Sequence, residues 1–463
     1  MNKKTADNIL SENRSSAGVI LALAGPTMLE NFMGTAVQYV DTAMVGSLGT
    51  AATAAVGCTT TVNWLIGHTI SAIGVGFLSF IAKAMGAGDE EKGGRASAQA
   101  VILSAVIGIF GTALTLALAR FVPGWMKADE TIRDTAAAYF AILYSALLFR
   151  TATIVFGTLL RAAGDTKTPM WVGIGMSLVN VVLNFLLIYD TRYVNIAGKS
   201  LLIYGAGMGV VGAAAASAVS FAVGGIAITA ALWRHKRISP EGKSFAPDPE
   251  ILSPCLRVAL PNMLQRFCTS LGYVVFAVMI NSLGEISTAA HTIANTVESA
   301  FYIPGFGMQA AIATLTGNCI GARAPERFRD LSRTAVRLEF LMMVVSGGML
   351  FTFAPAMVSL FSKDAQVVAL GGTVLKMVAV SEPLYGISII TEGMLQGAGL
   401  TKKAFIFSVI CMWGIRIFGT WLCVSRGSMG LIAAWACMIA NNMALLALLR
   451  IYWRRVSGKI FEN

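Results

Sequence analysis

Length, composition and charge together exclude most classes of soluble protein. The chain has 463 residues, of which 56% are hydrophobic and only 13% are charged, with a net charge of +11. Soluble domains carry about 25% charged residues, so ordinary soluble enzymes and disordered scaffolds are excluded. The positive balance suits cytoplasmic loops of a membrane protein, and no nucleic-acid-binding motif accompanies it. We therefore expect no nucleic-acid partner, and the lipid bilayer as the surroundings.

Apolar stretches, separated by short charged or Gly/Pro-rich segments, predict an all-α polytopic membrane protein. A spanning helix takes roughly 20 apolar residues, and the length fits twelve helices. The polar N-terminus is followed by no cleavable signal peptide. In chain order, the predicted spans are 17–46, 53–82, 97–120, 135–158, 168–189, 207–233, 254–280, 288–317, 335–360, 369–394, 404–424 and 428–452. The longer connections are 190–206 and 234–253.

The basic residues of the connections give an orientation. If both termini are cytoplasmic, the inner segments hold 23 Lys and Arg and the outer segments hold 7. Cytoplasmic loops of membrane proteins carry this excess. The sequence therefore predicts a multi-pass protein of the cytoplasmic membrane with both termini inside.

An internal repeat relates the two halves in a constant register. Pro26 matches Pro261, Ser47-Leu48-Gly49 matches Ser282-Leu283-Gly284, and LLRAAGDTK (159–167) matches MLQGAGLTK (394–402). Six helices per half make this a parallel repeat, which predicts two lobes around a central cavity. The expected division is a cytoplasmic N-terminal tail 1–16, an N-lobe 17–233, a cytoplasmic inter-lobe loop 234–253, a C-lobe 254–453 and a cytoplasmic C-terminal tail 454–463.

The chain resembles the MATE (multidrug and toxic compound extrusion) family of the MOP flippase superfamily, of prokaryotic type. The resemblance rests on PTMLENFMGTAVQYVDTAMVGSLG, GTLLRAAGDTKTP, NVVLNFLLIYD, INSLGEISTAAH and GMLQGAGLTKKA, and spans nearly the whole chain. It implies a two-lobed bundle that exports organic cations or amphipathic compounds in exchange for protons or sodium. It also implies the branch whose cation site lies in the N-terminal lobe.

Asp41 is the strongest candidate for cation coupling. It lies inside the first predicted span, where a carboxylate is costly unless it is protonated, paired or facing water. Such a group can load and release a proton, although a structural pairing with a neighbouring helix is the plainer alternative. The resemblance places the coupling aspartate of the family at this position, within VDTAMVG.

Three polar residues on the fifth and sixth predicted spans are further coupling candidates. Asn180 and Asn184 are four residues apart and so share a helix face. Their amide oxygens can bind sodium, with Asp41 and Asn180 as its ligands, or they can form ordinary interhelical hydrogen bonds. In the resembling branch the Asn184 position is often an aspartate, so this chain departs there. Ser217 falls where that branch often has a hydroxyl, with close helix packing as the alternative.

Prolines and other acidic residues complete the candidate set. Pro26 and Pro261 predict kinks in matching helices, which either couple bending to protonation or are static. Glu30 shares a face with Asp41 about 16 Å away and either lines the same cleft or, as we prefer, lies in the inner headgroup zone. The possible cavity or substrate contacts are Glu30, Gln38, Glu298, Glu382 and Glu392.

The second lobe is expected to lack an acidic ion site in its first helix. The segment 261–281 contains no Asp or Glu, and Phe276 stands at the position that matches Asp41. Arg416 and Lys376 could pair with carboxylates. The seven cysteines and three histidines show no metal-ligand spacing, so no metal site is predicted apart from possible sodium.

These observations predict a secondary antiporter that works by alternating access. No phosphate-binding P-loop is present, so an ion gradient would supply the energy, with the proton or sodium as coupling ion and no cofactor. A lipid-linked saccharide flippase of the same superfamily is the alternative. A membrane-embedded enzyme would need paired catalytic groups, and none is visible. We expect a small organic cation or amphipathic substrate, and a monomer.

Overall fold

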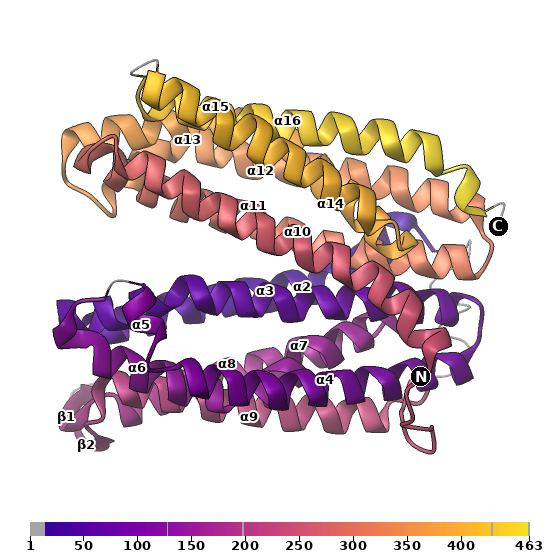
Figure 1. Cartoon of the computed structure of the whole chain (residues 1–463), viewed down its shortest axis with the longest axis horizontal. Helices are drawn as coiled ribbons and strands as arrows, with labels where there is room; N and C mark the ends of the chain where they lie inside the picture. Colours follow the sequence, from indigo (N-terminus) through magenta and orange to yellow (C-terminus); the bar gives the residue numbers. More distant parts are fainter. Residues whose placement is uncertain (1–13, 127, 197–198, 427–428, 462–463) are drawn as a thin grey trace.

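Two bundles of long helices make up the computed structural model, which describes residues 14–126, 128–196, 199–426 and 429–461 (Figure 1). The first bundle contains α2 (Ser16–Gly46), α3 (Thr50–Gly86), α4 (Glu90–Leu118), α5 (Val122–Trp125), α6 (Glu130–Ser145), α7 (Leu147–Ala162), α8 (Lys167–Leu187), β1 (Asp190–Ile196), β2 (Lys199–Ala206) and α9 (Gly209–Arg234). The second contains α10 (Pro249–Asn281), α11 (Glu285–Gly321), α12 (Pro325–Ser359), α13 (Ala365–Ala398), α14 (Thr401–Val409), η2 (Ile410–Ile417), α15 (Phe418–Trp421), η3 (Leu422–Arg426), α16 (Leu431–Val456) and η4 (Lys459–Phe461).

The predicted all-α polytopic membrane fold is confirmed. Among the described residues, ten helices are long and apolar enough to cross a membrane, and the pair α6–α7, bent by 49°, makes an eleventh span. The remaining long helix, α11, has 37 residues and packs against α2 and α3 of the first bundle as well as α12 and α13. Its more polar sequence is tolerated because neighbouring helices surround it.

Several elements differ from the predicted spans for identifiable physical reasons. Helix α4 begins at Glu90 rather than 97, because the Asp89 side chain caps its first turn by accepting from the Lys92 amide. The span predicted at 135–158 is broken at Ala146 between α6 and α7. The connection predicted at 190–206 is an antiparallel β-hairpin, a small exception to the all-helical architecture, whose β-branched and aromatic residues favour strands.

The repeat extends to backbone conformation. Gly49 and Gly284, which match each other in the repeat, have φ angles of 109° and 98° before α3 and α11. Gly88, with φ 74°, corresponds to Arg323, with φ 51°. Arg323 thus holds a left-handed conformation that glycine adopts without steric cost. Both lobes use the same turn after their second long helix, although only the first lobe has the glycine.

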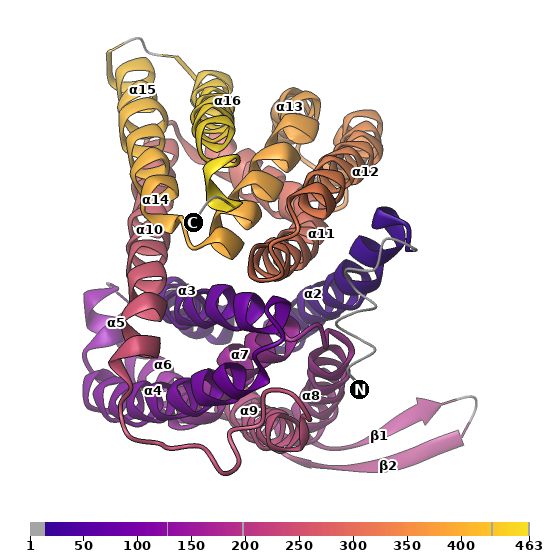
Figure 2. The same ribbon diagram turned by 90° about the vertical axis from the view of Figure 1, so that its right-hand side faces the viewer.

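The two lobes converge at one end of the molecule. Figure 1 shows α10 and α11 slanting towards α2 and α3 at the end where α16 finishes, and diverging from them towards the β-hairpin, and Figure 2 shows the two bundles from that end. Ser79 Oγ donates to the Gly397 carbonyl at 3.0 Å, and Lys83 Nζ donates to the Ala398 carbonyl at 2.8 Å. An apolar cluster also joins Ile20 of α2 to Ile312 of α11. These contacts hold the two lobes together at the end of the molecule where α16 finishes.

The inter-lobe segment packs onto the first lobe. Arg237 is 6% exposed, and its Nε donates to Glu90 Oε1 at 2.8 Å. Asp248, the N-cap of α10, forms an ion pair with Arg95 of α4. Ion pairs therefore hold the segment predicted as a polar loop at 234–253 against the first turns of α4.

Candidate functional site

The structure brings Asp41, Asn180, Asn184 and Ser217 together from three helices of the first lobe. Asp41 lies in the last turns of α2, the two asparagines lie on one face of α8, and Ser217 lies in α9. Asn184 Nδ2 donates to Asp41 Oδ1 at 2.5 Å. Asn180 and Asn184 are 6% and 1% exposed, while Asp41 is half-buried. The carboxylate is thus held by amides but keeps some access to the surroundings.

The amide of Asn180 is best satisfied with its nitrogen facing the carboxylate. In that orientation Nδ2 donates to Asp41 Oδ1 at 2.8 Å and to Oδ2 at 3.1 Å, and the amide oxygen accepts from Ser217 Oγ at 3.2 Å. Two amide groups then donate to one carboxylate. Asn184 Oδ1 is buried without a hydrogen-bond partner among the described residues. The amide nitrogens of the cluster are therefore arranged to stabilise a carboxylate, and the Asn184 amide oxygen takes no part in this.

Tyrosines near this cluster went unnoticed in the sequence. Tyr139 of α6 lies within electrostatic range of Asp41 and packs against the apolar group that contains Val45 and Ile188. Tyr189, just past α8, donates to the Met44 carbonyl at 3.3 Å. An intramembrane tyrosine has no distinctive spacing, so only the fold reveals these neighbours. Together they close the end of the cluster nearest the β-hairpin.

Glu30 is engaged by Arg161 of α7. Arg161 Nη2 donates to both carboxylate oxygens of Glu30 at 2.7 Å, and the two side chains are 16% and 22% exposed. Thr314 of α11 donates to the Arg161 carbonyl at 3.3 Å, which brings the second lobe to the same place. The role of Glu30 that the structure supports is an interhelical ion pair between α2 and α7, rather than a free carboxylate lining a cleft.

The second lobe has an uncharged version of this pair at the repeat-related positions. Glu30 corresponds to Gln265 and Arg161 to Gln396, in the same register that matches Pro26 with Pro261. Both glutamines donate to Glu392 Oε1, Gln265 at 2.9 Å and Gln396 at 3.4 Å. Glu392, a predicted substrate contact, is therefore held by amides between α10 and α13. The repeat register was the signal that could have revealed both sets.

Buried acids do occur in the second lobe, on helices other than α10. Glu298 of α11, Glu339 of α12 and Glu382 of α13 are 6%, 0% and 1% exposed. Both carboxyl oxygens of Glu339 and of Glu382 lack hydrogen-bond partners among the described residues. The expectation that the second lobe lacks an acidic site therefore holds only for the segment 261–281. Glu339 was overlooked, although it lies inside the predicted span 335–360.

Arg416, a candidate partner for a carboxylate, lies within electrostatic range of Glu298 of α11 without forming an ion pair with it. Its guanidinium lies 4.2 Å from the ring centre of Phe276 and 4.7 Å from that of Tyr273, and no ion pair of the described residues includes it. Lys376 likewise lies over the Phe351 ring at 5.8 Å. Cation–π contact replaces ion pairing at both positions. Phe276, which matches Asp41, thus faces a cation where Asp41 faces amides.

A π-helical turn explains why Arg416 reaches Phe276. The strict repeat register pairs Asn180 with Ile415, but η2 spans Ile410–Ile417 as a π-helix. A π turn takes in extra residues relative to an α turn, so the register beyond it slips towards the next residue. Arg416 thereby takes the place that Asn180 has in the first lobe.

The remaining candidates stay apart from these clusters. Gln38 is exposed on α2, and its carbonyl accepts from Thr42 Oγ1 at 2.8 Å. Pro26 and Pro261 lie inside α2 and α10, which continue as helices through them. No group of three or more potential metal-binding side chains occurs among the described residues.

Comparisons with known proteins agree with this architecture. The MatE family model matches residues 26–186 and 261–422, one stretch in each lobe. The "Probable multidrug resistance protein NorM" of Thermotoga maritima is 29% identical over 441 residues, which cover 95% of this chain and 92% of that protein. The "Probable multidrug resistance protein YoeA" of Bacillus subtilis is 25% identical and covers 85% of this chain and 83% of that protein.

A solved structure has the same fold along its whole length. It is described as an outward-facing conformation of a multidrug resistance MATE family transporter of the MOP superfamily, and it superposes with a TM-score of 0.89 at 25% identity, covering 98% of each chain. The family model matches more than half of this chain. The chain therefore belongs to the MatE family, and it is a transporter rather than an enzyme.

Proposed function

We propose that this chain is a secondary antiporter of the cell membrane that exports organic cations or amphipathic compounds in exchange for protons by alternating access. The multidrug resistance names of its relatives support a drug-like substrate. The single observation that carries the proposal is the Asp41 cluster, a carboxylate within a membrane-spanning helix that is held by amides from a second helix. Intramembrane carboxylates of transporters commonly serve as proton relays.

Proton binding would rearrange this cluster. The charged Asp41 accepts from Asn184 and Asn180, but a protonated carboxyl has one oxygen that donates instead of accepting. A proton on Oδ2 would break the 3.1 Å bond from Asn180 while the bonds to Oδ1 persist, which would weaken the link between α2 and α8. Protonation would in this way be coupled to the position of α2, the helix that also packs against α11 of the other lobe.

The orientation of Asn184 favours the proton over sodium. Sodium needs oxygen ligands, whereas the Asn184 nitrogen faces the carboxylate at 2.5 Å. The Asn184 amide would have to turn over before its oxygen could join Asp41 and Asn180 around sodium. A proton needs only the carboxylate itself. We therefore assign the proton as coupling ion, with no cofactor.

The lobe contacts support one state of an alternating-access cycle. The lobes meet at the end where α16 finishes, through contacts such as Lys83 with Ala398, and diverge towards the β-hairpin (Figure 1). With both termini cytoplasmic, as the excess of basic residues on that side predicts, this arrangement opens outwards. The reverse rocking motion would open the cytoplasmic side.

The candidate substrate contacts fall into two groups. Glu30 is engaged by Arg161, and Glu392 is engaged by Gln265 and Gln396. The carboxyl oxygens of Glu382 have no such partners among the described residues, and Glu298 lies within electrostatic range. A buried carboxyl without partners needs either a proton or a cation. We propose that Glu382 meets the cationic group of the substrate in the second lobe, beside Glu298, which already faces Arg416.

The decisive experiment measures efflux of a fluorescent organic cation from membrane vesicles, with proton and sodium gradients imposed separately. We expect a proton gradient alone to drive efflux, and Asp41→Asn to reduce it to the level of protein-free vesicles. Asp134→Asn, which alters an exposed acid on α6, is the matched control and should transport normally. Efflux driven only by sodium would contradict the coupling ion. Normal efflux by Asp41→Asn would contradict the site.

Further measurements test the proposed topology, oligomeric state and substrate class of the protein. Labelling of single cysteines added at either terminus should require permeabilised cells if both termini are cytoplasmic. Size-exclusion chromatography coupled to light scattering should give the mass of one chain if the protein works as a monomer. Movement of a labelled lipid-linked saccharide without any movement of cations would instead support a flippase.

A further inference from the structure

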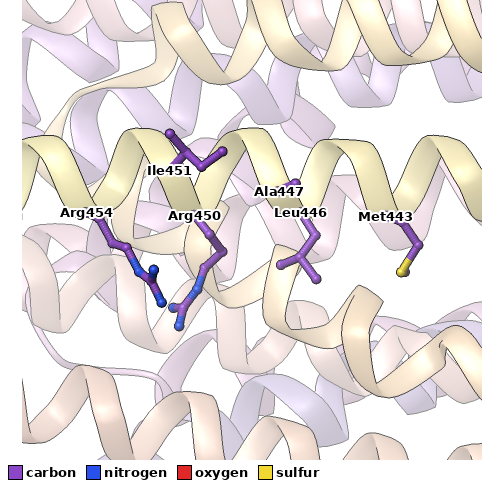
Figure 3. A pocket seen from close by; sticks show the side chains of 6 residues that line it. All are labelled: Met443, Leu446, Ala447, Arg450, Ile451 and Arg454. Carbon is purple, nitrogen blue, oxygen red and sulfur yellow. The ribbon is translucent and has the colours of Figure 1, made fainter.

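A groove runs along one face of the last membrane-spanning helix. It has a volume of about 320 Å³, and Figure 3 shows the side chains that line it. They all belong to α16: Met443, Leu446, Ala447, Arg450, Ile451 and Arg454. Met443, Leu446, Arg450 and Arg454 lie three or four residues apart, so together with the neighbouring Ala447 and Ile451 they form a stripe along the helix. The stripe is apolar in its first part and carries two guanidinium groups at the end of the span.

The opposite face of α16 holds the helix in the lobe. Leu449 and Trp453 are 1% and 7% exposed, and the Trp453 ring packs on Phe328 of α12 at 5.8 Å. Tyr452 packs on Phe407 of α14 at 5.9 Å. The groove residues are thus not needed to bury α16 in the protein. Arg454, Ala447 and Ile451 are exposed.

Among the described residues, neither groove arginine has an acidic partner. No ion pair formed by the part of the chain that the structure describes includes Arg450 or Arg454. In this part of the repeat Gly209 matches Gly430, and the same register places Thr229 and Trp233 of α9 at the positions of the two arginines. The fold therefore does not require a basic pair here, because the first lobe has the same helix without one.

We propose that this groove binds an anionic glycerophospholipid, with its phosphate at Arg450 and Arg454 and an acyl chain along Leu446 and Met443. Guanidinium groups bind phosphate oxygens through paired hydrogen bonds. Arg and Lys near the end of a spanning helix lie at the level of the headgroups. The apolar part of the stripe continues from there towards the middle of the span. A zwitterionic lipid brings its own cation and fits two unpaired arginines less well.

The test is native mass spectrometry of the full-length protein with phosphatidylglycerol or with phosphatidylcholine of the same acyl chains. We expect Arg450→Gln combined with Arg454→Gln to weaken phosphatidylglycerol retention about 30-fold, since each basic residue near an anionic surface contributes about 1 kcal/mol. The matched control combines Arg455→Gln with Lys459→Gln. It removes two charges from the same end of the chain, but neither residue lines the groove, so retention should change little.

Two further measurements keep the proposal falsifiable. Ala447→Trp fills the groove without changing any charge and should also reduce phosphatidylglycerol retention. Inorganic phosphate at millimolar concentration should not displace the lipid. Equal losses in the two double variants would show a general effect of surface charge and would overturn the site. Equal retention of phosphatidylcholine, or displacement by inorganic phosphate, would overturn the assignment to an anionic lipid.

Discussion

Gly86 and Gly321, which match each other in the repeat, make the same contact from opposite lobes. A Cβ atom on Gly86 would collide with the carbonyl oxygen of Asn318, and a Cβ atom on Gly321 would collide with that of Lys83. Lys83 and Asn318 are themselves a matching pair in the same register. The ends of α3 and α11 therefore cross with pseudo-two-fold symmetry at a distance that only glycine permits.

Replacing one glycine at this crossing with a larger residue should force the two lobes apart where α3 and α11 end. We expect Gly86→Val to destabilise the closed arrangement by about 1–3 kcal/mol, the usual cost of overpacking. A cysteine introduced at Ser79 should then react faster with a thiol reagent applied from the cytoplasmic side, and efflux should fall.

Gly57→Val is the matched control for this variant. It makes the same substitution in the same helix, at a glycine whose added Cβ would meet nothing within 4 Å. It should leave labelling at position 79 unchanged. Unchanged labelling in Gly86→Val as well would show that the crossing does not set the separation of the lobes.

The ion pair of Glu30 and Arg161 predicts that a single substitution destabilises the protein more than the double substitution does. Removing one partner of a largely buried pair leaves an unpaired charge and costs about 3–5 kcal/mol. Because both side chains keep some exposure, we expect Arg161→Gln to lie at the low end of that range. Adding Glu30→Gln should recover most of the loss, since it removes the carboxylate that Arg161→Gln leaves unpaired. Thermal unfolding in detergent measures both effects, and equal or additive losses would contradict the pairing.

Much of the molecule could be predicted from local sequence pattern. Apolar runs locate the spans, and the repeat gives the two lobes. Intramembrane polarity singles out Asp41, and an i,i+4 spacing singles out Asn180 and Asn184, whereas Ser217 and the grouping of all four are implied by the resemblance to the MATE family. These signals lie within single helices or in a constant register, so they need no knowledge of packing.

The remaining features depend on contacts that no local pattern encodes. Glu30 and Arg161 are far apart in the sequence, and only the packing of α2 on α7 joins them. The π-helical turn at Ile410–Ile417 shifts the register by which Arg416 would have been placed. The contact of Arg416 with the Phe276 ring depends on this packing. The hairpin at 190–206 was missed because its short strands lie in a stretch identified only as a long connection.

The proposed substrate contact at Glu382 predicts a change in transport without a loss of stability. Glu382→Gln keeps the shape of a side chain whose carboxyl oxygens have no partners among the described residues, so the midpoint of thermal unfolding should stay within a few degrees. Export of a dication should weaken more than export of a neutral amphipathic compound. Glu392→Gln is the matched control in the same helix, because its carboxylate is engaged by amides. Equal effects on the two substrates would remove Glu382 from the substrate site.

Asn184→Asp tests why this chain would prefer protons. The variant places a second carboxyl group where an amide nitrogen now lies 2.5 Å from Asp41. Two carboxylates in contact cannot both be charged without a counter-ion, so they must share a proton or bind a cation. Sodium would gain two anionic oxygen ligands and lose an obstructing amide nitrogen. We therefore expect efflux by Asn184→Asp to be stimulated by a sodium gradient that leaves the parent protein unaffected. Asn184→Leu, which removes the amide without adding a charge, should show no sodium response. Sodium indifference in Asn184→Asp, with efflux otherwise intact, would mean that this residue does not select the coupling ion.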